Sequence, residues 1–372
     1  NAECPLRPSY GEHKVHKTKT LLKMATNDHT SDDKMRKVIL AINFILLAIG
    51  NCGGPLIMRL YYLHGGNRIW LSSWLQTVGW PLILIPLIIA YLHRRKKDHT
   101  KFFLITPRIF LASSVLGILI GVDNYLYSYG CSKLPVSTSS LIIATQLVFT
   151  ALFAYFLVKQ KFTAFSVNAI VLLTVGAVIL ALRGGSDKPK GESTKEYLIG
   201  FILTLAAAGL YGFVMPFVEL TYTKAKQSIS YALVLEVQMV ICFFATAFAT
   251  VGTIVNNDFK VISREASQFG LGEEKYYVVL IWSAILWQCF FLGAIGVISY
   301  GSSLLSGITI TVLLPVTELL GVIFYHEKFQ SEKGVALFLS LWGFISYFYG
   351  EMKQNKIVSS SQSTTQPVSE SV

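Results

Sequence analysis

Ten long apolar runs divide this chain, and each is long enough to cross a lipid bilayer. A membrane-spanning helix needs about 20 mostly apolar residues, because the hydrocarbon core is about 30 Å thick. In lipid the backbone must satisfy its own hydrogen bonds, which a helix does within one segment. We therefore expect an all-α membrane protein with ten transmembrane helices. They are predicted at residues 37–60, 70–92, 108–130, 135–158, 163–182, 197–220, 230–255, 277–300, 304–325 and 333–350.

The charge of the chain lies outside these runs. The formal net charge is +11, but only 14% of the residues are charged and 53% are hydrophobic. The basic residues lie in tails and short loops, and Arg94–Lys97 forms the strongest short cluster. Basic loops set membrane orientation, so we expect both tails in the cytosol and the lipid bilayer, rather than nucleic acid, as the partner of this chain. The five cysteines form no Cys/His cluster, which predicts neither a metal site nor a cofactor.

The two halves of the chain resemble each other. A Ser-Tyr-Gly triplet closes the third run at 128–130 and the eighth at 299–301, and a Lys-Phe pair follows each at a similar distance. Two repeats with five spans each have opposite orientations in the membrane, as in many transporters. The predicted layout is a disordered polar tail (1–36), a first repeat (37–182), a polar linker (183–196), a second inverted repeat (197–350) and a disordered Ser/Thr-rich tail (351–372).

Three carboxylic acids lie within the apolar runs, at Asp123, Glu236 and Glu318, and no Lys or Arg lies at the same depth. A charge at the bilayer centre costs about 2.5–3.5 kcal/mol even on insertion scales, so such residues usually face a cavity. Burial without a basic partner disfavours an ionised carboxylate. A group of this kind can bind and release a proton as the cavity opens to either side. We therefore predict that these three acids couple transport to protons.

Amide side chains accompany the acids. Asn51 lies in the segment Gly50–Pro55, where Pro55 leaves the carbonyl of Asn51 without its helical donor. The glycines of this segment are consistent with a hinge that lines a cavity, or with tight packing of two helices. Asn124 follows Asp123, and Gln146 shares a helical stripe with Ser139 and Thr150. We predict that Asn51, Asn124 and Gln146 bind substrate.

Aromatic residues make up 13% of the chain, and most of them are expected to face lipid or the membrane interface. Trp74, Tyr211 and Tyr300 differ because they lie beside polar residues or glycine, so we predict that they stack on a ligand. Acids, amides and aromatics without a base disfavour phosphate-bearing substrates. They favour flat, nitrogen-rich molecules, since amides pair with a purine edge and aromatic rings stack on its face.

Three long segments resemble the plant purine permease family of the drug/metabolite transporter superfamily. They read GNCGGPLIMRLYYLHGGNRIW (50–70), LPVSTSSLIIATQLVFTALFAYFLVKQKF (134–162) and LLPVTELLGVIFYHEKFQSEKG (313–334). The resemblance implies the drug/metabolite transporter fold, with ten helices in two inverted repeats and both tails cytosolic. It also implies proton-coupled uptake of adenine-like bases and cytokinins, usually at the plasma membrane.

Other functions compete with purine transport. The seven histidines form no zinc-enzyme motif, so we do not expect an enzyme. A membrane sensor that transports nothing would not need an acid that carries protons. A transporter of alkaloids, or of vitamins such as pyridoxine, would share every feature described so far, because the shape of the cavity decides the cargo.

Overall fold

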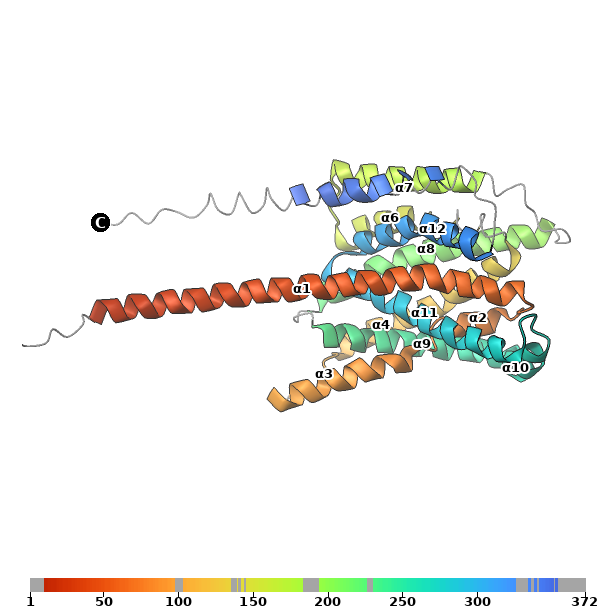
Figure 1. Cartoon of the computed structure of the whole chain (residues 1–372), viewed down its shortest axis with the longest axis horizontal. Coiled ribbons are helices and arrows are strands. Elements are labelled where there is room, and N and C mark those ends of the chain that lie inside the picture. Colours follow the sequence, from red (N-terminus) through yellow and green to blue (C-terminus); the bar gives the residue numbers. More distant parts are fainter. Residues whose placement is uncertain are drawn as a thin grey trace, which may run out of the picture. The chain divides into compact units, whose positions relative to one another are not determined.

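The computed structural model describes residues 10–97, 103–134, 139, 142–143, 145–182, 194–225 and 230–325, and parts of a last helix within 334–353. All regular elements in these ranges are helices (Figure 1). They are α1 (Tyr10–Leu63), α2 (Ile69–Leu75), η1 (Trp80–Ile83), α3 (Leu84–Lys97), α4 (Pro107–Lys133), α6 (Gln146–Val158), α7 (Ala164–Leu182), α8 (Thr194–Lys224), α9 (Tyr231–Val255), α10 (Asp258–Ser267), α11 (Glu273–Tyr300) and α12 (Ser303–Tyr325).

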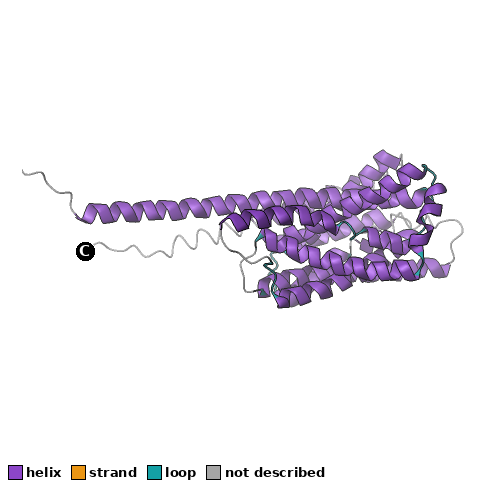
Figure 2. Ribbon diagram, turned by 90° about the horizontal axis from the view of Figure 1, so that it is seen from below, coloured by secondary structure: helices purple, strands orange, loops and turns teal. Residues whose placement is uncertain are grey.

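The chain forms two compact units, Asn1–Ile42 and Asn43–Val372, and the second holds everything discussed below. In this second unit α4 packs against both α8 and α9, and α6 packs against α8. Figure 1 shows these helices running alongside one another, and Figure 2 shows the helices of the described residues in a view from below. Of the predicted tails and linker, residues 1–9, 183–193 and 354–372 lie outside the described part of the chain, whereas residues 10–36 of the predicted disordered tail belong to α1.

Seven helical segments in the described residues are long and apolar enough to cross a membrane. They are Met35–Leu63, Ile69–Leu92, Pro107–Lys133, Lys195–Lys224, Tyr231–Val255, Glu273–Tyr300 and Ser303–Tyr325. Each coincides with a predicted span. The shorter apolar helices Gln146–Val158 and Ala164–Gly176 fall within two further predicted spans. Residues 341–350 of the last predicted span are helical. The protein is therefore an all-α, multi-pass membrane protein.

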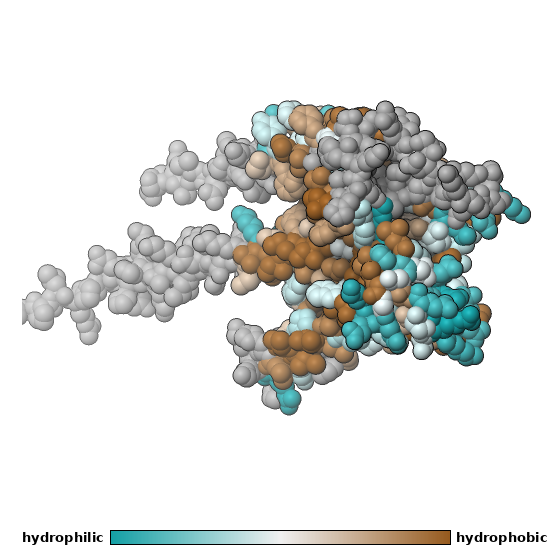
Figure 3. Space-filling model, turned by 45° about the vertical axis from the view of Figure 1, so that its right-hand side comes forward, coloured by the Kyte–Doolittle hydropathy of each residue, from teal (hydrophilic) through white to brown (hydrophobic). Residues whose placement is uncertain are grey.

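Large hydrophobic side chains cover the outside of this unit. Hydrophobic residues occupy the middle of the coloured surface in Figure 3, and hydrophilic residues gather toward its ends. The side chains of Ile85, Leu111, Val251 and Trp282, on four different helices, are all at least half exposed. Apolar exposure on this scale is unfavourable in water but suits a surface that contacts lipid tails.

The second predicted span is broken, although the sequence analysis treated it as one run. Helix α2 ends at Leu75, a turn follows, and a short 3₁₀ helix begins at Trp80 before α3 continues to Lys97. Pro81 lies in the first turn of the 3₁₀ helix. Proline has no N–H and its ring crowds the carbonyl four residues earlier, which favours a kink or a break in the helix at this point. Irregular backbone at membrane depth is tolerated where it is buried in protein or lines a cavity.

Helices α1 and α11 touch through glycines. A Cβ atom on Gly50 would collide with the backbone of Phe290, and one on Gly53 would lie 2.8 Å from the side chain of Leu286. The glycines of segment 50–55 therefore serve close helix packing, which was one of the two interpretations of this segment. Asn51 and Pro55 in the same segment face a pocket instead.

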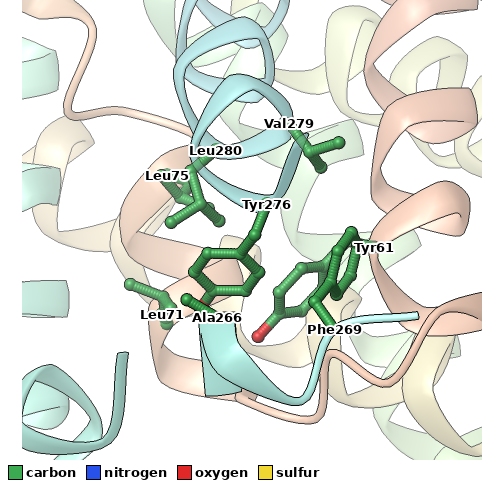
Figure 4. Packing of buried hydrophobic residues seen from close by; sticks show 8 residues of the cluster. All are labelled: Tyr61, Leu71, Leu75, Ala266, Phe269, Tyr276, Val279 and Leu280. Atoms are coloured by element: carbon green, nitrogen blue, oxygen red, sulfur yellow. The ribbon is translucent and has the colours of Figure 1, made fainter. Parts of the chain in front are cut away.

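One end of the second unit is held by an aromatic and ionic cluster around Glu265. The rings of Tyr61 and Tyr276 lie near each other in this cluster, with centroids 6.2 Å apart (Figure 4). Both hydroxyls donate to the Glu265 carboxylate, and Arg68 Nε lies 3.3 Å from its other oxygen. Arg68 also lies 3.8 Å from Asp258. The cluster therefore ties the segment after α1 to α10 and α11.

Candidate functional site

A pocket opens among the helices of the second unit. Its empty space, open mouth included, is about 650 Å³. Helices α1, α4, α6, α8, α11 and α12 and the break after α2 contribute to its wall. The lining residues are Asn51, Pro55, Gln76, Asp123, Asn124, Tyr127, Ile143, Gln146, Ala207, Ala208, Tyr211, Trp287, Phe290, Phe291, Ile310 and Leu314.

Five of the nine residues predicted for the site line this pocket. They are Asn51, Asp123, Asn124, Gln146 and Tyr211. They come from four helices that are far apart in the sequence, and the side chain of each is less than a tenth exposed. The structure thus brings together acid, amide and aromatic groups, as the sequence analysis expected. Their roles in binding and proton coupling stay predictions.

Three polar atoms of the wall are buried without a hydrogen-bond partner among the described residues. They are Asp123 Oδ1, Asn124 Nδ2 and Trp287 Nε1. A buried polar group left unpaired costs about 1–3 kcal/mol, so each such group calls for a partner such as a ligand or a water molecule. Since all three line one pocket, they can together offer hydrogen bonds to one bound molecule.

Other amides in the wall are engaged by neighbouring helices. Gln76 Nε2 donates to Ser128 Oγ at 2.9 Å and lies 3.4 Å from the carbonyl oxygen of Asn124. Asn51 Nδ2 lies 3.4 Å from the carbonyl oxygen of Ile310, and Gln146 Nε2 lies 3.5 Å from Met215 Sδ. These contacts hold the amide side chains at the pocket, and Gln76 ties the break in the second span to α4.

Aromatic rings form one side of the pocket. Trp287 meets Tyr127 edge to face, with ring centroids 5.7 Å apart, and meets Phe290 in the same way at 5.5 Å. Phe290 in turn stacks on Tyr211 at 6.0 Å and contacts Phe291 at 5.2 Å. Rings that hold one another in this way give a rigid apolar surface for a flat ligand.

Among the described lining residues, one carboxyl group is the source of charge. Asp123 is the acid of the lining, and no Lys or Arg is among the described residues that form it. A phosphate group buried here would meet no cation, although buried phosphates are normally bound by Arg or Lys. The pocket therefore suits a neutral or weakly basic molecule.

Three further predicted residues, Trp74, Glu236 and Tyr300, are not among the residues that line this pocket. Trp74 donates its indole N–H to Thr250 Oγ1 at 2.9 Å and packs against Phe259. Tyr300 packs against Tyr231, with ring centroids 6.5 Å apart. Glu318 belongs to α12, but its side chain lies outside the described part of the structure.

Glu236 has a structural contact that the sequence did not reveal. It is only 1% exposed, and its Oε2 accepts the backbone N–H groups of Leu104 and Ile105, each at 2.8 Å. These residues directly precede α4, which begins at Pro107. The carboxylate therefore anchors α9 to the start of the helix that carries Asp123. Its predicted part in proton coupling stays a prediction.

We expect Glu236→Ala to lower the thermal denaturation midpoint more than Glu236→Gln does. Alanine removes the acceptor of two backbone N–H groups, and an unpaired buried donor costs about 1–3 kcal/mol. Glutamine keeps an acceptor oxygen at this position. Thermal denaturation of both variants in detergent, followed by size-exclusion chromatography, shows which variant has the lower midpoint. If Glu236→Gln folds well but transports without any response to pH, the anchoring role alone does not explain this residue.

Several lining residues were missed by the sequence analysis, among them Gln76, Trp287, Phe290 and Phe291. Gln76 and Trp287 had a usable signal, because Gln76-Thr77 and Trp287-Gln288 put polar side chains in the middle of apolar runs. The phenylalanines had no such signal, since a Phe in an apolar run can face lipid equally well.

Comparison with known proteins decides the family. The sequence model for purine nucleobase transmembrane transport matches residues 38–357. The chain belongs to this family. Purine permease 3 of Arabidopsis thaliana is 57% identical over 326 residues, covering 87% of this chain and 93% of the relative. Purine permease 2 of the same plant is 56% identical over 338 residues, covering 87% and 94%.

This purine nucleobase transporter also shares its fold with a solved structure. A crystal structure at 17% sequence identity superposes with a TM-score of 0.58, covering 83% of this chain and 97% of the other. At this identity the likeness concerns the fold alone. Family membership confirms the resemblance seen in the sequence, and the transporter is not an enzyme.

Proposed function

We propose that the pocket is the substrate site of a proton-coupled importer that moves purine bases and related nitrogen heterocycles by alternating access. The observation that carries this proposal is the grouping of Asp123, Asn124 and Trp287. Their polar atoms have no partner among the described residues, and all three residues line an aromatic-walled pocket in which no described residue is a Lys or Arg. Family membership independently supports a purine nucleobase as substrate.

The chemistry of the wall matches a purine in two ways. An asparagine can pair with adjacent donor and acceptor atoms on a purine edge, and Asn124 offers its free N–H₂ for this. Aromatic rings such as Tyr211 can stack on the purine face. Asn51 and Gln146 complete the amide set, while Trp74 and Tyr300 stay predicted contacts outside this pocket. The apolar residues Ile143, Ile310 and Leu314 also line it, and they can contact an apolar substituent such as that of a cytokinin.

Asp123 is our preferred proton carrier. Its carboxyl is 7% exposed and lies in the pocket, and its Oδ1 has no partner in the described structure. A proton bound there would neutralise the group next to the substrate, so that proton and substrate can cross together. Glu236 and Glu318 remain candidates for the same role, but the anchoring contact of Glu236 favours Asp123 over it.

For the architecture we propose ten helices in two inverted five-helix repeats, residues 37–182 and 197–350. Support comes from the repeated Ser-Tyr-Gly and Lys-Phe motifs and from the seven long apolar helices at their expected positions. We place both tails in the cytosol because Arg94–Lys97 falls on the same side as the tails, and we place the protein in the plasma membrane.

Uptake of radiolabelled adenine by yeast that lacks its own purine carrier tests this function. We expect saturable uptake that is faster at about pH 5 than at about pH 8 and is abolished by a protonophore. Uptake that ignores pH and protonophore would contradict proton coupling but not purine transport. Competition by cytokinins, alkaloids and pyridoxine then ranks the cargo, and stronger competition by an alkaloid or pyridoxine than by any purine would favour the alternative cargo.

A further inference from the structure

Trp287 combines an aromatic ring and a buried hydrogen-bond donor in the wall of the pocket. It lies on α11 and its side chain is only 5% exposed. Its ring forms part of the aromatic wall, and its Nε1 is buried without a hydrogen-bond partner among the described residues. Trp74 differs in this respect, because its Nε1 donates to Thr250. The indole N–H of Trp287 is thus a buried donor at the ligand space.

We propose that Trp287 selects the substrate by donating its indole N–H to an unprotonated ring nitrogen of the heterocycle. This inference rests on the proposed placement of the substrate in the pocket. It assigns a specificity-determining contact to one of the three unpaired polar groups of the wall.

The indole differs from the other two unpaired groups because it can act only as a hydrogen-bond donor. An indole N–H donates and cannot accept. An asparagine amide can present either its donor or its acceptor, and a carboxyl group can do so by binding a proton. Asn124 and Asp123 can therefore adapt to different substrates, whereas Trp287 requires an acceptor. A heterocycle that carries C–H in place of that nitrogen leaves the indole N–H unpaired, and polar sites reject such analogues strongly.

Packing keeps the indole from turning away. Tyr127 and Phe290 both meet its ring edge to face. On the α1 side, a Cβ atom added to Gly54 would lie 3.0 Å from Trp287 Cε2 and 3.2 Å from Cδ2. The glycine therefore lets the indole lie directly against α1. A donor held on several sides has a fixed direction, which is what makes it selective.

Adenine and its 1-, 3- and 7-deaza analogues test the proposal, because each analogue replaces one acceptor nitrogen by C–H. Inhibition constants against labelled adenine are measured for the full-length transporter and for Trp287→Phe. In the native protein we expect at least one analogue to bind at least about tenfold more weakly than adenine. In Trp287→Phe we expect that penalty to shrink to about twofold or less, because the donor is gone.

Trp282→Phe is the matched control, because Trp282 lies on the same helix and its side chain is 51% exposed. It should keep the native ranking of the analogues. If Trp287→Phe does not reach the cell surface, β-(3-benzothienyl)alanine at position 287 keeps the ring shape and replaces N–H by sulfur. The same loss of discrimination is then expected.

The outcomes separate this inference from the proposed function. If every analogue is discriminated equally by the native protein and by the position-287 variants, Trp287 is not the selective donor. If no analogue is penalised in the native protein, the inference also fails. Neither result bears on the proposal that the pocket is the substrate site. That proposal fails if Asn124→Leu and Gln146→Leu both fold and leave adenine uptake and its inhibition constants unchanged.

Discussion

Asp123→Asn should abolish the pH-driven accumulation of adenine while leaving exchange of adenine across the membrane intact. With one proton per substrate, each pH unit across the membrane can support about a tenfold accumulation, since 1.4 kcal/mol corresponds to that factor. Asparagine has nearly the shape of aspartate but cannot bind a proton at this pH. The carboxyl of Asp123 is buried in the pocket, so we expect no solvent-exposed acid to replace it as the proton carrier.

Counterflow and net uptake, measured on the same cells, separate the two activities. Counterflow of labelled adenine against unlabelled adenine should persist in Asp123→Asn, whereas net uptake should no longer respond to pH or protonophore. Glu196→Gln is the control, because Glu196 is about half exposed and pairs with Lys133 at 3.5 Å, away from the lining residues. If Asp123→Asn still accumulates adenine in response to pH, another acid carries the proton.

Gly50→Ala should lower the thermal stability of the transporter, although alanine is normally the better helix residue. The new methyl group would collide with Phe290 N and Cα, which are backbone atoms and cannot rotate away. Overpacking of this kind costs about 1–3 kcal/mol, and more where backbone must move. Helices α1 and α11 would have to separate, and Phe290 and Trp287 would move with α11, so we expect weaker adenine binding as well.

Gly209→Ala provides the opposite expectation within the same protein. A Cβ atom on Gly209 would have its nearest neighbour, in the ring of Phe149, at 4.0 Å, which is ordinary contact. Alanine there should be neutral or should stabilise the helix by up to about 1 kcal/mol. The thermal denaturation midpoint of Gly50→Ala should therefore be clearly lower than that of Gly209→Ala. An equal decrease in both would mean that the α1–α11 contact is not the cause.

The apolar runs predicted the helices well because length and hydropathy are set by the bilayer. All seven long described spans coincide with predicted ones. The break in the second span was missed, although Pro81 and Pro86 were visible in the sequence. Proline alone does not decide the outcome, since α1, α8 and α12 each contain a proline and continue through it. Neighbouring helices determine whether the freed backbone groups can be satisfied.

The polar part of the pocket was predictable because acids and amides in lipid are costly, and the aromatic part was not. Trp282 and Trp287 show why. They lie five residues apart on α11, about 140° apart around the helix. One side chain is 51% exposed and the other 5%. Both are acceptable in an apolar run, so only packing against α1 and α4 distinguishes them. Likewise, Asp123 and Glu236 look alike in sequence, and only the structure reveals the backbone contacts of Glu236.

The glycine contact between α1 and α11 limits which substitutions can alter the substrate specificity of this transporter during evolution. Phe290 meets Gly50 and Trp287 meets Gly54, and both rings also line the pocket. A substitution that packs these helices more tightly must reshape the ligand space, and one that widens the ligand space must loosen the helices. New cargo is therefore reached more readily by substitution at Ile143, Ile310 or Leu314, which line the pocket from α12 and the segment before α6.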